Sequence, residues 1–150
     1  MMRTFIGFII LFLAPSASAE IIKVKVNDGV ATLPSVFRVG DQVVIARQYG
    51  RDAEAQTFPE SVAGQMLQAL NNVERTVKNS KYSNATLSNC MVGVLDWASS
   101  SEIKTSFNSY FSDGSPPKYF IVEKLNFPDA EAKIDLTCKA QNETFLETQD

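Results

Sequence analysis

One stretch near the C-terminus constrains the fold most strongly, because its alternation assigns each side chain to one of two faces. In "KIDLTCKA", which runs from Lys133 to Ala140, apolar residues recur at every second position. The apolar positions are Ile134, Leu136, Cys138 and Ala140, and the polar positions are Lys133, Asp135, Thr137 and Lys139. A period of two is typical of a β-strand with one buried face. We predict a strand here, preceded by a second strand that follows Pro116-Pro117.

Three earlier runs also have strand character. They are "IIKVKV" at residues 21–26, "VFRVGDQVVIARQYG" at 36–50 and "ATLSNCMVGVL" at 85–95. Asp28-Gly29 predicts a tight hairpin turn after the first run, and Gly40-Asp41 divides the second run into two strands.

Two segments between these runs change to a helical period. In the first, apolar residues recur along one stripe: Val62, Met66, Leu70, Val73 and Val77. Thr57 and Glu60 have the spacing of a capping box around Pro59, so the helix is predicted to start there.

The second helical segment begins at another capping-box match, Ser99 and Glu102, and continues with Ile103, Phe107 and Phe111 on one face. The element order therefore predicts an α+β fold in one domain, with a mixed sheet and both helices on one face. That domain covers residues 20–150, and its polar tail, 141–150, is predicted to fray.

The first 19 residues have the pattern of a secretory signal peptide. Arg3 precedes a short apolar run, and Ala17-Ser18-Ala19 ends it as an A-x-A cleavage site. The alternatives are an uncleaved anchor or a buried strand, but the run is short for a membrane span. We expect a secreted or periplasmic protein with no membrane contact after cleavage at Ala19.

The composition excludes several chemistries. The chain contains no histidine, which removes His-based acid/base catalysis and His-ligated metals, and two cysteines cannot build a zinc site alone. A net charge of −3 without a Lys/Arg cluster argues against a nucleic-acid partner. We expect neither a metal nor a cofactor.

Several segments resemble one known family, the RidA/YjgF reactive intermediate deaminases. "VGDQVVIARQ" (39–48) is similar to the strand that ends in the family's S-G-Q, and "AGQMLQALNNVERTVKNS" (63–80) is similar to its first helix. "NATLSNCMVGVLDWASSSEIKTSFNSYF" (84–111) resembles the next strand and second helix, and the last two strands complete the match. The resemblance covers residues 39–140.

The resemblance implies a chorismate-mutase-like fold and a homotrimer with ligand clefts between subunits. Active members hydrolyse enamines and imines to keto acids and ammonia, without metal or cofactor. Their pocket uses an arginine in a P-A-R motif, which holds the substrate carboxylate bidentately. A glutamate on the last strand and a serine before G-Q complete the pocket.

The chain departs from this pattern at each position. The P-A-R motif corresponds to Pro116-Pro117-Lys118, or one position earlier; the glutamate corresponds to Asp135, and S-G-Q to Ala46-Arg47-Gln48. Lys118 and Asp135 are therefore the candidate catalytic residues, and Arg47 and Gln48 join them as candidate ligand-binding residues. A second interpretation leaves Lys118 and Asp135 as solvated charges at strand edges.

The departures predict a protein whose deaminase pocket is degraded: a non-catalytic trimer that binds a small molecule or a protein. The alternative is a divergent imine deaminase that uses Lys118, Arg47 and Asp135. Ribonuclease activity, attributed to some relatives, is disfavoured by the acidic charge and the missing histidine.

Two further predictions concern covalent modification. The strands that contain Cys90 and Cys138 are neighbours in the family's sheet, so the resemblance and the export signal together favour a disulfide over two buried thiols. Asn84 and Asn142 lie in glycosylation sequons, which are used only in a eukaryotic host.

Overall fold

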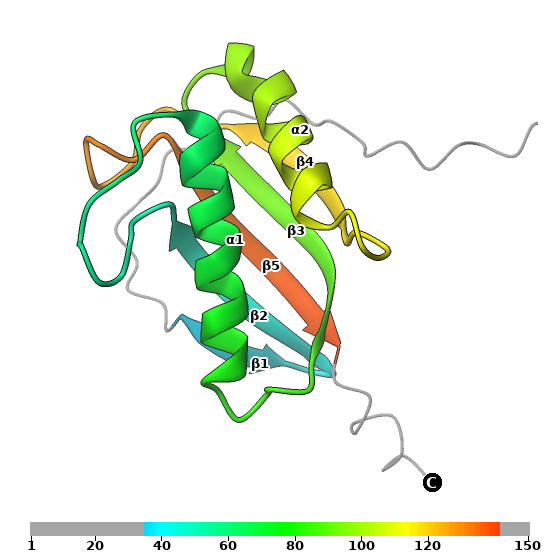
Figure 1. The fold of residues 1–150 in the computed structure, drawn as a ribbon. Helices are drawn as coiled ribbons and strands as arrows, with labels where there is room; N and C mark the ends of the chain where they lie inside the picture. Colours follow the sequence, from blue (N-terminus) through cyan, green and yellow to red (C-terminus); the bar gives the residue numbers. More distant parts are fainter. Residues whose placement is uncertain (1–34, 142–150) are drawn as a thin grey trace, which may run out of the picture.

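The computed structural model describes residues 35–141, which form a five-stranded sheet with both helices on one face (Figure 1). The strands are β1 (Val36–Val39), β2 (Gln42–Tyr49), β3 (Thr86–Val94), β4 (Lys118–Glu123) and β5 (Ile134–Gln141). The helices are α1 (Val62–Lys78) and α2 (Ser100–Tyr110), and a short 3₁₀ turn (Trp97–Ser99) leads into α2. The predicted α+β class, with two helices covering one face of a mixed sheet, is confirmed.

The sheet order is β1-β2-β5-β3-β4, so the last strand along the chain is the middle strand of the sheet. Only β3 and β4 run parallel, and α2 crosses between them; the other three pairs are antiparallel. Gly40, with φ of +62°, makes the tight turn from β1 to β2. The predicted run at 21–26, the signal peptide and Asn142 lie outside the described residues.

The core lies between the sheet and the helices, and the alternation of β5 supplies its centre. All four apolar positions of that strand are fully buried, as predicted. They pack with the buried stripe of α1 and with two residues of α2: Met66, Leu70, Val73, Val77, Ile103 and Phe107.

Neither predicted capping box forms, although α2 does begin directly after Ser99 as predicted. Helix α1 begins at Val62, where the Ser61 side chain accepts from the Gly64 N–H at 2.9 Å, so Thr57 is not its cap. Helix α2 follows the 3₁₀ turn without a side-chain cap at Ser99. The Glu102 carboxylate instead accepts from the Ala63 N–H of α1 at 2.9 Å. The spacing matched a capping box, but Glu102 reaches a different helix.

One buried side chain of α1, Gln65, holds the loops beside the sheet in place. The Gln65 amide donates to the Pro59 and Glu131 carbonyls, each at 3.0 Å, and accepts from the Lys133 N–H at 2.8 Å. This bonding ties the β4–β5 connection to the start of α1. Neither helix of the described chain is both long and apolar enough to cross a lipid bilayer.

Candidate functional site

Three of the four candidate residues, Arg47, Lys118 and Asp135, lie on or beside the sheet face that the helices leave uncovered, which we call the open face. Alternation places on it the residues between the core positions. Its central row crosses three strands, because Met91 is in register with Phe120 on one side and with Thr137 on the other. All three side chains are half-buried. The open face therefore has an apolar centre.

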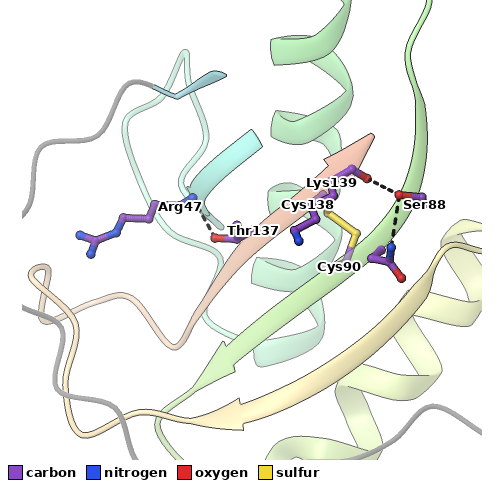
Figure 2. The surroundings of a disulfide bond; sticks show 7 residues. Arg47, Ser88, Cys90, Thr137, Cys138 and Lys139 are labelled. Carbon is purple, nitrogen blue, oxygen red and sulfur yellow. Dashed lines mark hydrogen bonds between the residues drawn. A yellow bond between two sulfur atoms is a disulfide. The ribbon is translucent and has the colours of Figure 1, made fainter. Parts of the chain in front are cut away.

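Arg47 stands at an irregularity in β2. The register with β5 shifts between Ile45 and Gln48, which is the signature of a β-bulge, and Arg47 takes a left-handed φ of 49°. Its backbone N–H donates to the Thr137 hydroxyl at 3.2 Å. Figure 2 shows the Arg47 side chain extending away from β5. The bulge thus aims a guanidinium outward from the edge of the open face.

Gln48 points to the other side of the sheet. It lies opposite Leu136, a core position, and its amide donates to the Ala46 carbonyl at 2.9 Å. Its side-chain oxygen accepts from the Thr76 hydroxyl of α1 at 3.4 Å. The structure therefore separates Arg47 from Gln48, although the sequence placed both in one site.

Asp135 is the largest departure from expectation. The alternation of β5 put it on a solvated polar face, but it is only 1% exposed and forms an ion pair with Lys124, which is 6% exposed. Lys124 directly follows β4 and accordingly must reach across β3 to meet β5. The interpretation of Asp135 as a solvated strand-edge charge is wrong. Asp135 is buried against Lys124, a residue that the sequence analysis did not single out.

Gly93 makes this ion pair possible. It lies on β3, opposite Asp135 in the register, and a Cβ placed there would come within 2.1 Å of Asp135 Oδ1 and 2.7 Å of Lys124 Cε. The lysine stem occupies the space that a side chain would take. Glycine inside a strand often marks such a close approach. Gly93, between two valines in a predicted strand, was therefore the one sequence signal that another group approaches the sheet here.

Aromatic side chains surround the ion pair. The Phe127 ring lies 5.5 Å from Lys124 Nζ, and it meets the Tyr49 ring edge-on at 6.0 Å. Tyr49 is in register with Asp135. Tyr49 of β2 and Phe127 of the β4–β5 connection therefore help to shield the carboxylate and the ammonium group from solvent.

Lys118 is not part of this cluster. It is exposed at the start of β4, opposite Asn89, whereas Asp135 is opposite Gly93, four residues further along β3. Four residues of a strand span about 13 Å. The structure does not bring the two candidate catalytic residues together, and the assignments of ligand-binding roles remain predictions.

The predicted disulfide between Cys90 and Cys138 is present. The two cysteines are direct partners in the antiparallel β3–β5 register, with Cα atoms 4.1 Å apart (Figure 2). Both are buried on the helix side of the sheet. The disulfide therefore joins the strands beneath the open face without occupying it. Asn84, of the first sequon, is exposed in the connection from α1 to β3.

Solved structures with the same fold identify the class. The YjgF protein of E. coli is 19% identical, with a TM-score of 0.64 over 77% of this chain and 91% of its own. RidA from the Antarctic bacterium Psychrobacter sp. PAMC 21119 is 19% identical, with a TM-score of 0.61 over 81% of this chain and 97% of its own.

A third structure contains a ligand. It is E. coli TdcF with bound serine, 18% identical, with a TM-score of 0.65 over 81% of this chain and 98% of its own. No protein-family model matches the sequence, and no curated protein matches it. At these identities the likeness defines the fold, which is that of the YjgF/RidA proteins.

Proposed function

We propose that the chain is an exported, divergent relative of the RidA proteins that forms a homotrimer and binds a small carboxylate without catalysis. The observation that carries this proposal is the buried ion pair of Asp135 with Lys124. It neutralises the carboxylate that the resemblance placed in the deaminase pocket, and Arg47 at the β2 bulge supplies an anion-binding group instead.

Imine hydrolysis needs a group that positions or activates water next to a carboxylate-binding cation. Asp135 is enclosed, and its partner Lys124 is shielded with it. Lys118 lies at the far end of β4, in solvent. Within one subunit, Lys118 is therefore too far from the Asp135–Lys124 pair for the two to act on one bound molecule.

A small carboxylate is the ligand that Arg47 recognises best. A guanidinium offers two parallel N–H donors to a carboxylate, and Arg47 carries this fork at the edge of the open face. TdcF, with the same fold, has been solved with bound serine, which also bears a carboxylate. This parallel supports an amino-acid-sized ligand.

The open face supports the proposed assembly into an oligomer. Its half-buried central row, with the apolar side chains of Met91 and Phe120, has no helix over it, and such a surface is typical of a subunit interface. A neighbouring subunit over this row would place Arg47 in the cleft at its edge.

Two assays on the chain that starts at Glu20 test the proposal. Calorimetry with L-serine and with propionate should detect binding, and Arg47→Gln should weaken it about tenfold or more, since a charge-assisted contact is lost. Arg38→Gln, on the edge strand β1, is the matched control and should bind like the parent protein. Failure of both ligands to bind would contradict the proposal.

The second assay measures ammonia from imines that an amino-acid oxidase generates. We expect release no faster than without protein. Turnover that Lys118→Ala or Asp135→Asn abolishes would instead support the alternative, a divergent deaminase built from Lys118, Arg47 and Asp135.

Export is tested separately. Mass spectrometry of protein recovered from the periplasm or medium should find Glu20 as the first residue. Recovery of the intact N-terminus in the cytoplasm would contradict export and leave the binding proposal untouched.

A further inference from the structure

A pocket lies on the helix side of the sheet, on the opposite side from the Arg47 guanidinium. It is a pocket of about 350 Å³, a volume suited to a small molecule. It is lined by the last turns of α1, the α1–β3 connection, the start of β3, the residue after α2 and the segment before β4. Both the last turn of α1 and the residue that follows α2 therefore contribute to this pocket.

The pocket has an apolar wall. Phe111 lines it and is held by two other rings, with centroids 5.0 Å away at Phe107 and 5.1 Å away at Tyr110. Leu87 and Pro117 continue the apolar lining. An aromatic or branched aliphatic group of a ligand would pack against this wall.

Charged and partly charged groups also line the pocket. Glu74 lines it, and the carbonyl ends of α1 and α2 add partial negative charge. The Tyr110 hydroxyl donates to Asn71 Oδ1 at 3.1 Å. Burial raises the pKa of Tyr110, and the nearby Glu74 carboxylate raises it further, so the hydroxyl keeps its proton. Lys78 is the opposing cation on the rim.

We propose that this pocket binds a small organic cation with an apolar body, with its ammonium group at Glu74 and its body against Phe111. The charges favour a cationic ligand. The Glu74 carboxylate and the partial negative charges at the C-terminal ends of α1 and α2 together outweigh the positive charge of Lys78. The ligand has the opposite charge to the carboxylate proposed for the open face, so the two sites are separable by ligand alone.

The test is an NMR titration of the chain from Glu20 with 2-phenylethylamine. Amide signals of Val77, Leu87 and Phe111 should shift, and those of Arg47 and Thr137 should not. The isosteric anion 3-phenylpropionate should leave the pocket signals unchanged. Methylamine, which has the charge without the body, should bind more weakly. Absence of saturable shifts in the pocket with 2-phenylethylamine would overturn the proposal.

Two variants with opposite expected signs sharpen the test. Glu74→Gln should weaken amine binding about fivefold, and Lys78→Met should strengthen it by about the same factor, as expected for exposed charges. Glu54→Gln and Lys139→Met make the same changes of net charge outside the pocket lining and should leave the affinity unchanged.

Three results would contradict the proposal. Weaker binding in Lys78→Met would indicate a zwitterionic ligand, and equal weakening in Glu54→Gln would indicate unspecific attraction to an acidic protein. Loss of oligomer mass in Leu87→Asp, measured by light scattering, would make the pocket an interface between copies of this chain.

Discussion

Lys124 and Asp135 are shielded from water together, and the ion pair between them offsets part of the cost of burying two charged groups. Removing one partner leaves a buried charge without compensation. We expect Lys124→Met or Asp135→Asn alone to lower the free energy of unfolding by about 3–5 kcal/mol in urea denaturation. The double variant Lys124→Met/Asp135→Leu should lose much less than the sum. Additive losses would show that the pair does not interact as described.

The left-handed φ of Arg47 makes a second prediction at this scale. Glycine adopts this conformation without the Cβ penalty, so Arg47→Gly should be more stable than Arg47→Ala by about 1 kcal/mol. Both variants lose the guanidinium, so the difference in stability between them measures the backbone strain at this position. At Arg38, in β1, the order should reverse, because glycine weakens a strand. Equal stability of the two Arg47 variants in thermal denaturation would contradict the assigned bulge.

These residues also show where sequence reasoning stops. The alternation of β5 correctly divided its side chains between two faces, because a period of two is a local property. It did not predict that Asp135 is buried, since this depends on Lys124 arriving from another strand and on the space above Gly93. The match to S-G-Q singled out Arg47 and Gln48, but it predicted neither the bulge at Arg47 nor the opposite directions of the two side chains.

At the scale of elements, the start of α1 is open to a direct test. Ser61→Ala should destabilise the protein by about 1 kcal/mol, because the Gly64 N–H loses its acceptor. Thr57→Ala should change stability little, since that side chain is exposed and precedes the helix. Chemical denaturation of both variants decides whether Ser61 or Thr57 caps α1. A larger loss of stability in Thr57→Ala would favour the predicted capping box at Thr57 and Glu60.

The disulfide links two elements that are far apart along the chain, with a sequence separation of 48. Closing a loop of this length stabilises the fold by about 3–4 kcal/mol in the chain-entropy model. Reduction, or the pair Cys90→Ala/Cys138→Ala, should lower the melting temperature and leave the oligomer mass unchanged, because both cysteines face the core. Dissociation on reduction would place the disulfide at an interface instead.

For the whole molecule, the open face predicts the assembly. Light scattering of the chain from Glu20 should give three times the subunit mass. Phe120→Asp, in the central apolar row, should give monomers, because a buried carboxylate there has no partner. Asn108→Asp, exposed on α2, makes a comparable change on the helix side and should remain trimeric. A monomeric parent protein would contradict the trimer.

Some features of the overall architecture were predictable from the sequence and others were not. The element types followed from periodicity, and the segregation of helices and strands followed from their order. The position of β5 between β2 and β3 follows from no local pattern, because strand order depends on contacts between distant segments. The resemblance to a known family predicted the neighbouring strands that allowed Cys90 to be paired with Cys138.

The central place of β5 has a consequence for the order of folding. Until residues 134–141 have been synthesised, the β1–β2 hairpin and the β3–β4 unit have no strand to join them, and each presents an open hydrogen-bonding edge. We therefore expect the sheet to close only after β5 has been made. Insertion of this strand between β2 and β3 is a non-local event, which is expected to be slow and to leave open strand edges exposed to aggregation until it occurs.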